Sequence, residues 1–462
     1  MRIFYYLLIL LVIFALSACA SYYQKNQAIM DSIYRGDYAH ASKLLDNGNL
    51  KKKKRNQLLY FLNKGTLLFM NNQPQESNKY FQQADYFIED YQKNIGLKAV
   101  SFITNPSIQI YEGENFEKVM VHYYTTINYL QQGLLDQALV ECKRMQLKLD
   151  KITDYYKGKN KYKNDAFVYL LTGIVYDAQK DYNSAFIAYR NAYKIYNEEY
   201  ANNLNTSVPK QLKEDLIRTA LLTGFKDEAI QYQTQFNLKH FTIESFKNTS
   251  SFVTFWNNGF GPIKDQRSLN FTIVPGSNGW VNFTNWDLGL NFPFYAGDDS
   301  RSICNLKIIR VAFPKYISRE TVYDKAKIII DSLQIEQNIE LVQNLDKIAY
   351  ISLQDRMVKE MSEALIRLAI KQAAAAKLRK ENDALGSTLS VINAMSEQAD
   401  TRNWQTLPNT INYTRINLPV GNYQAIFQVE KNQLKFKFSI KENQTTFKVF
   451  QSPYFKGYSN SF

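Results

Sequence analysis

The chain has 462 residues, which is too long for a single hydrophobic core, and at roughly 150 residues per domain it predicts two or three domains. Its apolar share of 45% is that of a globular protein. Lys and Arg outnumber Asp and Glu by 56 to 43, so an anionic surface or partner is one interpretation of the net charge of +13. We favour a general compositional bias, because Lys, Asn, Tyr and Ile are abundant along the whole chain.

The first twenty residues have the pattern of a secretory signal. Arg2 precedes an apolar run from residue 3 to residue 15, and small residues follow the run. The run ends in a tetrapeptide that resembles the bacterial lipobox: Leu16, Ser17, Ala18 and Cys19. The resemblance implies that residues 1–18 are a lipoprotein signal peptide and that Cys19 carries the lipid. Because Ala20 and not Asp follows Cys19, it also implies the outer membrane, with the body in the periplasm; an uncleaved membrane anchor is the alternative.

Two short helices are predicted from Ala28 to Leu45, separated at Gly36. A basic run, KKKKR, follows from Lys51 to Arg55. Such a run beside a membrane anchor can bind anionic head groups. We favour the simpler interpretation, a solvated turn between helices.

The clearest helical pattern lies between residues 165 and 196. Its small residues predict two antiparallel helices that touch at Gly173 and Ala185, with aromatic side chains filling the space on either side. The stretch resembles a tetratricopeptide (TPR) repeat, W-x2-L-G-x2-Y followed by A-x3-F, with Tyr in place of Trp and Phe. A pair of this kind cannot bury its apolar face alone, so stacked neighbours are expected.

Three more helix pairs are predicted at residues 58–91, 119–149 and, more weakly, 210–236. The TPR-like positions along the chain are Phe61, Gly65, Phe81, Ala84, Ala138, Tyr169, Gly173, Tyr176, Ala185, Tyr189 and Ala192. The pattern predicts a TPR-like α-solenoid over residues 19–240. The first helices of its pairs are expected to form a concave groove that binds a protein or an extended peptide.

Beyond residue 240 the pattern changes to short apolar runs separated by Gly, Pro and Asn, which is typical of strands and turns. Strands are expected at 252–256, 269–274, 280–285, 289–295 and 304–313, with two more within 326–342 and hairpins over 411–450. A helix is expected from Asp355 to Arg379. We expect it to lie between the sheet and a second helix at 389–399; a membrane-lying or oligomerising helix is the alternative. Residues 244–462 are therefore predicted to form one α+β domain, predominantly β with an inserted helical segment.

Three segments carry a wider resemblance: residues 121–124, 186–193 and 399–408. In these the chain resembles a family of Gram-negative lipoproteins that join TPR repeats to a β-rich C-terminal domain. The resemblance implies no activity. In the last segment, Arg402 and Trp404 either form a surface feature, or Arg402 pairs with a carboxylate while Trp404 packs in the core.

No pattern in the sequence predicts an enzyme, a metal site or a cofactor. The three histidines, His40, His122 and His240, are too scattered for a zinc motif, and no phosphate-binding loop or nucleophile elbow is present. Cys142 and Cys304 are interpreted as small buried hydrophobes, with a disulfide between them as the alternative. Nucleic acid is not expected as a partner, because the basic residues form no recognisable module.

The leading hypothesis is therefore a periplasmic adaptor at the outer membrane, whose TPR groove binds one or more envelope proteins. Regulation of peptidoglycan synthesis is one form of this hypothesis, by analogy of architecture. An assembly factor for an envelope secretion or export complex and a cell-wall hydrolase are the alternatives.

Overall fold

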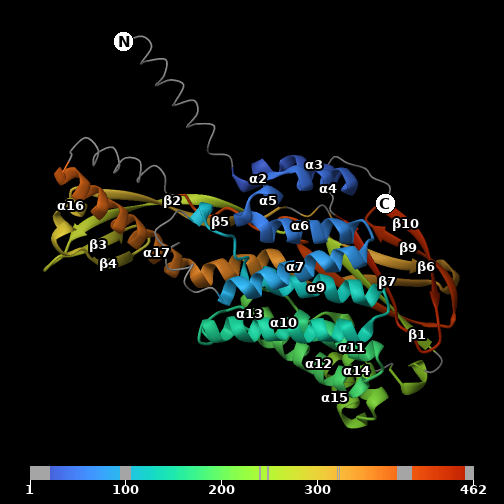
Figure 1. The fold of residues 1–462 in the computed structure, drawn as a ribbon. Helices are drawn as coiled ribbons and strands as arrows, with labels where there is room; N and C mark the ends of the chain where they lie inside the picture. Colours follow the sequence, from blue (N-terminus) through green and yellow to red (C-terminus); the bar gives the residue numbers. More distant parts are fainter. Residues whose placement is uncertain are drawn as a thin grey trace.

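The computed structural model describes residues 21–93, 106–238, 241–246, 249–319, 321, 323–381 and 398–452 (Figure 1). The predicted signal peptide, the lipobox and Cys19 lie outside these residues. The described chain forms an N-terminal helical region followed by a β-rich region with a long helix inserted in it, so the predicted fold class is confirmed.

The helical region runs from residue 22 to residue 236. Its elements are α2 (Tyr22–Lys25), α3 (Gln27–Tyr34), α4 (Tyr38–Asn47), α5 (Asn49–Lys52), η1 (Lys54–Asn56), α6 (Gln57–Met70), α7 (Pro74–Lys93), η2 (Pro106–Ile108), α9 (Asn115–Gln131), α10 (Leu135–Tyr155), α11 (Ala166–Ala178), α12 (Tyr182–Ile195), the π-helical turn η3 (Tyr196–Tyr200), α13 (Ala201–Asn203), α14 (Lys210–Thr223) and α15 (Lys226–Phe236). The expected pairs are present as α3–α4, α6–α7, α9–α10, α11–α12 and α14–α15, and they stack side by side in Figure 1.

Local chemistry sets the ends of these helices. The carboxylates of Asp165 and Asp181 accept backbone N–H groups at the starts of α11 and α12. Pro74 is the first residue of α7, where its missing N–H leaves no hydrogen bond unmade. Gly224 follows α14 with a φ of +91°, the left-handed conformation that ends a helix and favours glycine.

The repeat glycines lie where an aromatic ring of the second helix crosses the first. A Cβ added at Gly173 would lie 2.5 Å from Cδ1 and Cε1 of Tyr189, and one added at Gly65 would lie 2.8 Å from Cε1 of Phe81. The nearest neighbour of Gly173 is therefore the Tyr189 ring and not Ala185. Of the other TPR-like positions, the buried ones are Ala84, Ala138, Ala185 and Ala192, and the half-buried ones are Phe61, Tyr169 and Tyr176.

The β-rich region contains two sheets. Its elements are η4 (Ile243–Phe246), β1 (Thr249–Asn258), β2 (Ile263–Pro275), β3 (Trp280–Asn285), β4 (Leu290–Tyr295), η5 (Gly297–Asp299), α16 (Ser300–Cys304), β5 (Ile308–Ile317), β6 (Ala326–Ile330), η6 (Asp331–Leu333), β7 (Ile335–Asn344), α17 (Leu345–Glu381), β8 (Thr410–Pro419), β9 (Gly421–Val429), β10 (Asn432–Ile440) and β11 (Thr446–Ser452). The seven-stranded sheet has the order β10-β9-β6-β7-β8-β1-β11, and only its β1–β11 pair is parallel. The four-stranded sheet has the order β4-β3-β2-β5.

The seven-stranded sheet curls around an apolar interior of its own. Phe252 of β1 stacks on Phe438 of β10, and Phe427 of β9 stacks on Phe450 of β11, each pair with ring centroids 4.1 Å apart. The opposite face of the sheet packs on the helices, where Phe255 belongs to the same core as α6 to α14. The helical region and this sheet therefore form one packed body.

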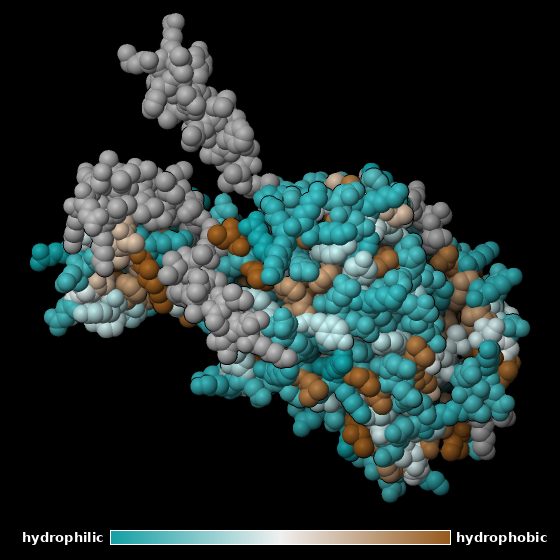
Figure 2. Space-filling view, in the orientation of Figure 1, coloured by the Kyte–Doolittle hydropathy of each residue, from teal (hydrophilic) through white to brown (hydrophobic). Residues whose placement is uncertain are grey.

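The four-stranded sheet forms a lobe that projects from this body together with α16 and the far half of α17 (Figure 1). Met361, Leu365 and Leu368 of α17 pack on Phe271 and Phe283 of the sheet. Figure 2 shows apolar side chains, in brown, among the polar ones on this lobe.

Two expectations concern the surroundings of α17 and the cysteines. Residues 389–397 of the second helix that we expected lie outside the described chain, and residues 398–409 that follow contain no helix. Cys142 and Cys304 are both free, so the disulfide alternative is wrong. Cys142 is fully buried, and burial raises the pKa of its thiol to about 12, which makes it an inert core residue.

Candidate functional site

The first helices of the pairs are buried on both sides, so the concave face of the solenoid is covered. Ten of the 14 residues of α6 and 13 of the 17 residues of α9 are buried, against six of 21 in the second helix α10. The cover consists of β1, β7, β8 and the segment 398–409 (Figure 1). The groove that we expected to be open to a partner is therefore occupied by the chain itself.

The segment 398–409 lies against α6 and α9 and is fixed there by Trp404. Its indole ring is 1% exposed and packs against Phe81 and Tyr124, with ring centroids 5.7 and 5.5 Å away. The indole Nε1–H donates to Oγ1 of Thr66 over 3.0 Å. The backbone N–H of Trp404 donates to Oε1 of Glu117 over 2.6 Å.

Arg402 joins the same segment to the start of the helical region. Its guanidinium pairs with Asp400 at 2.6 Å and donates to Asn56 at 3.2 Å. It also donates to the backbone carbonyls of Arg55 and Pro106. Of the two interpretations of this segment, the buried one is therefore confirmed: Arg402 pairs with a carboxylate and Trp404 packs in the core.

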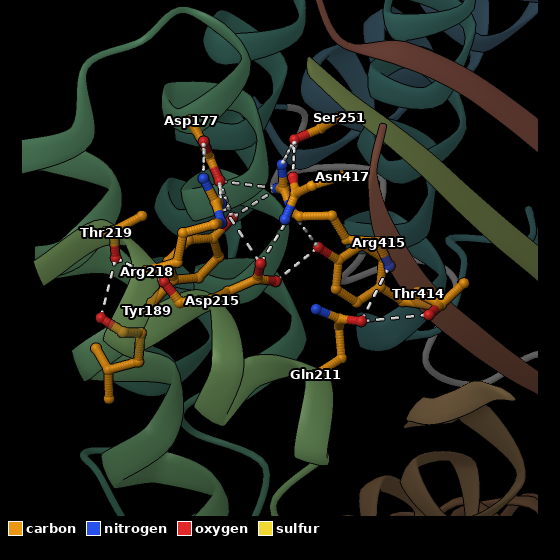
Figure 3. A network of polar contacts seen from close by, with 12 residues as sticks. Asp177, Tyr189, Gln211, Asp215, Arg218, Thr219, Ser251, Thr414, Arg415 and Asn417 are labelled. Carbon is orange, nitrogen blue, oxygen red and sulfur yellow. Dashed lines mark hydrogen bonds and ion pairs between the residues drawn. The ribbon is translucent and has the colours of Figure 1, made fainter. Parts of the chain in front are cut away.

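A second buried network joins the other end of the solenoid to β8 (Figure 3). Arg415 of β8 lies 2.8 Å from Oδ2 of Asp177 and 2.9 Å from Oδ1 of Asp215, and Arg218 pairs with both carboxylates. Tyr413 donates to Asp215 over 2.7 Å. Burial alone would lower the pKa of Arg415, but Asp177 and the neighbouring groups raise it well above its ordinary value. The positive charges of the two arginines and the negative charges of the two aspartates cancel. We call this network the joint, because it holds β8 against the helices.

A large cleft lies between the helical region and the projecting lobe. It has a volume of about 680 Å³ and is framed by α9, α10, α17, β2, β5 and the segments 109–114 and 398–400. Its charged residues are the seven cations Lys118, Lys148, Lys151, Lys264, Arg356, Lys359 and Arg367 and the five carboxylates Glu112, Glu114, Glu360, Glu363 and Asp400. A concave site with converging polar groups is the default location of a binding site.

Glu114 ties together three elements that frame the cleft. It immediately precedes α9, and it pairs with Lys264 of β2 over 2.6 Å and with Arg356 of α17. Arg356 in turn lies 2.6 Å from Glu360. Burial alone would raise the pKa of Glu114, but the charges of Arg356 and Lys264 outweigh burial and hold the pKa well below its ordinary value. Glu114 is therefore a carboxylate that keeps the walls of the cleft in place.

The pKa of Glu117, one turn further along α9, is shifted in the opposite direction. Its carboxylate accepts hydrogen bonds from Tyr111, from the backbone of Glu114 and from the backbone of Trp404. Burial, followed by the negative charge of Glu114, raises the pKa of Glu117 to about 7. This carboxyl group therefore titrates close to neutral pH at the junction of α9 and the segment 398–409.

The raised pKa of Glu117 predicts a pH-dependent stability. In the unfolded chain this carboxyl has a pKa near 4.3. The contribution of protonated Glu117 to the free energy of unfolding is therefore fully present below about pH 4.3 and is lost as the pH rises to 7, by about 3 kcal/mol in total. The difference in free energy of unfolding between wild type and Glu117→Gln, measured by urea denaturation from pH 5 to pH 8, should fall by an amount of this order. Glu76→Gln, at an exposed ion pair, is the control for removing a carboxylate outside the core. If the difference in free energy of unfolding between wild type and Glu117→Gln did not change between pH 5 and pH 8, the raised pKa of Glu117 would be contradicted.

His122 is buried between α7, α9 and α10 beside two carboxylates. Its Nδ1 lies 2.7 Å from Glu141, and its Nε2 lies 3.5 Å from Asp85, which also pairs with Lys148 at 3.0 Å. Burial alone would lower the pKa of His122, but the two carboxylates outweigh burial and raise it above its ordinary value. Within the described ranges, no group of three or more His, Cys, Asp or Glu side chains is placed to hold a metal ion.

Few patterns in the sequence indicate which residues frame the cleft. Glu114 and Lys264 are 150 positions apart, and Arg356 belongs to a third element. The Glu114–Glu117 capping box at the start of α9 is the one local pattern, and it marks a helix start and not a site. In the part of the chain that is described, no helix is both long and apolar enough to cross a bilayer.

No protein-family model and no curated protein matches the chain. Among solved structures, the TPR-like repeats of a kinesin light chain from Podosopora anserina align at 12% identity and a TM-score of 0.30, over 46% of this chain and 92% of theirs. MamA aligns at 14% identity and a TM-score of 0.28, over 48% of this chain and 98% of its own. Scores this low carry no argument about function. The TPR-like character rests on the helix pairs and glycine contacts described above.

Proposed function

We propose that the chain is an interaction scaffold of the cell envelope, without catalytic activity of its own. In this proposal a lipid on Cys19 holds it at the outer membrane, facing the periplasm, and the lipobox-like residues 16–19 support that placement. The observation that carries the scaffold role is the 680 Å³ cleft, because three separately built elements meet there and a buried ion-pair cluster fixes them.

The cleft takes the place of the covered groove as the site for a protein partner. Its rim carries Tyr155, which is 64% exposed and has Lys359 Nζ 4.8 Å from its ring centroid. Tyr156 packs edge-on against Tyr155 at 5.0 Å. Tyrosine and arginine are the residues that dominate binding energy at protein interfaces, and both line this cleft. We expect an extended protein segment with charges of both signs to bind here.

Site-specific photocrosslinking in intact cells tests the proposal. A photoreactive phenylalanine replaces Tyr155 in one variant and Tyr86 in another. Tyr86 is 72% exposed on α7 and does not line the cleft, so it is the matched control. We expect one envelope protein to crosslink through position 155 and not through position 86. The same product should weaken in a Lys359→Glu variant, because the charge at the rim is reversed.

The other outcomes separate the competing functions. Equal crosslinking at positions 155 and 86, or none at 155, would argue against the cleft as the binding site. A captured peptidoglycan synthase would favour regulation of wall synthesis, and a component of an export complex would favour an assembly role. A cleared band at 53.8 kDa or at the mass of the mature chain in a peptidoglycan zymogram would overturn the non-catalytic part of the proposal.

A further inference from the structure

The described fold begins at Ser21, which we call the entry point, two residues after Cys19. Ser21 caps α2, its Oγ accepting from the backbone of Gln24 over 3.3 Å, and its backbone N–H donates to the Gln24 side chain over 2.8 Å. Tyr22 is buried, and its backbone N–H donates to Thr401 over 3.3 Å. Two residues of extended chain span at most about 7 Å, so Cys19 cannot lie further than this from Ser21.

The segment that begins at this entry point is basic. Residues 21–56 contain eight Lys and Arg against three Asp, a net +5 within the +13 of the whole chain. Lys51, Lys52, Lys53 and Lys54 are all exposed. Of the three aspartates, Asp46 is already paired with Lys64 at 2.7 Å. Within the described ranges, Lys52, Lys53 and Lys54 form no ion pair.

The entry point and Arg55, the last residue of the basic run, line the same hollow in the surface. This concavity of about 320 Å³ is lined by Ser21, Lys25 and Arg55, together with Asp265 and Asp400. Arg55 is fixed there, because its carbonyl accepts the N–H of Tyr111 over 2.9 Å. The basic run is therefore held next to the point where the chain leaves the fold towards Cys19.

We propose that this basic face, formed by Lys25 and residues 51–55, lies against anionic phospholipid head groups of the bilayer. The inference deepens the proposed function and rests on lipid attachment at Cys19. The tether of about 7 Å keeps Ser21 close to the head groups, and the Debye length at physiological ionic strength is about 8 Å, so charges that lie beside Ser21 are only partly screened. From the sequence we favoured a solvated turn for residues 51–55, and this proposal takes up the alternative, binding to anionic head groups.

This contact also orients the cleft. Gln398, Ala399 and Asp400 line both the concavity at the entry point and the 680 Å³ cleft. The cleft and the concavity at the entry point are therefore adjacent. A partner that binds in the cleft would therefore bind near the membrane surface.

Vesicle binding of the full mature chain tests the proposal. Cys19→Ala removes the lipid, so that binding reports the face alone. Co-sedimentation is measured with phosphatidylcholine vesicles, with and without phosphatidylglycerol, at low and high salt. We expect binding only to the anionic vesicles and only at low salt. Changing Lys51, Lys52, Lys53 and Lys54 to Gln should reduce the partition coefficient by roughly a hundredfold or more, since each contributes about fivefold.

A matched control has the same change in net charge. Lys431, Lys435, Lys437 and Lys441 are exposed on and beside β10, and the same four substitutions there should leave binding within about threefold of the parent. Equal losses in the two quadruple variants, or no loss in the first, would overturn the proposal. Mass spectrometry of the N-terminal peptide from cells tests the anchor separately, because a lipidated chain without vesicle preference contradicts only the basic face.

Discussion

Replacing Arg415 by alanine is expected to lower the free energy of unfolding by about 3–5 kcal/mol. The side chain is 1% exposed and sits 2.8 and 2.9 Å from the carboxylates of Asp177 and Asp215. Without it, Arg218 alone faces two buried aspartates, and one negative charge is left uncompensated in the core. Urea denaturation at neutral pH measures the change, with the slope of the unfolding curve checked for two-state behaviour.

Two further variants separate this cause from simple loss of packing. Lys327→Ala removes a partner of Glu336 at an exposed pair and should cost less than about 1 kcal/mol. Arg415→Met combined with Asp215→Asn removes one charge of each sign, so it should cost clearly less than the sum of its two single changes. An additive double variant, or an Arg415→Ala variant within 1 kcal/mol of wild type, would show that the charge balance does not hold this joint.

The joint and the segment 398–409 together explain why the solenoid groove is closed. One lies at the α11–α14 end, where Arg415 joins β8 to the helices. The other lies at the α6–α9 end, where Trp404 occupies the groove. Between them, Tyr123 of α9 donates to Asn257 of β1 over 2.7 Å. The sheet is therefore fixed to the first helices at both ends and in the middle, and the groove has no room for a partner while these contacts hold.

The elements that the sequence predicted well are those defined by short-range periodicity. The expected run 280–285 is β3 residue for residue, because its side chains alternate, Gly279 directly precedes it and the turn at residues 286–289 follows it. The helix pairs were also recovered, since Gly65 and Gly173 mark the positions where a ring of the partner helix must pass. Each of these signals lies within about thirty residues of chain.

The covered groove depends on contacts that such local patterns do not contain. The parallel pairing of β1 with β11 joins Phe252 to Thr446 across most of the C-terminal region. One signal was present: α11 is apolar around nearly its whole circumference, and a helix of that kind is buried on all sides. A groove helix open to solvent would instead carry a polar face. The boundary of the two regions near residue 240 was visible, but the core shared across it was not.

Shortening Trp404 to alanine is expected to lower the free energy of unfolding by about 3–5 kcal/mol. The change removes a fully buried indole that packs on Phe81 and Tyr124, and a cavity remains between α6, α7 and α9. It also leaves the hydroxyls of Thr66 and Thr406 without their N–H donor. Urea denaturation followed by far-UV circular dichroism measures the loss, since the variant itself removes a fluorescent tryptophan.

Trp404→Phe is the matched control for this prediction. It keeps most of the ring packing and removes only the Nε1–H donor, so it should cost about 1–2 kcal/mol, well below the alanine variant. A Trp404→Ala variant as stable as wild type would mean that the segment 398–409 leaves the groove at little cost, and the solenoid face would again be a candidate binding site. The expected large loss instead makes the segment part of the core, because a partner would have to replace all of its buried contacts to enter.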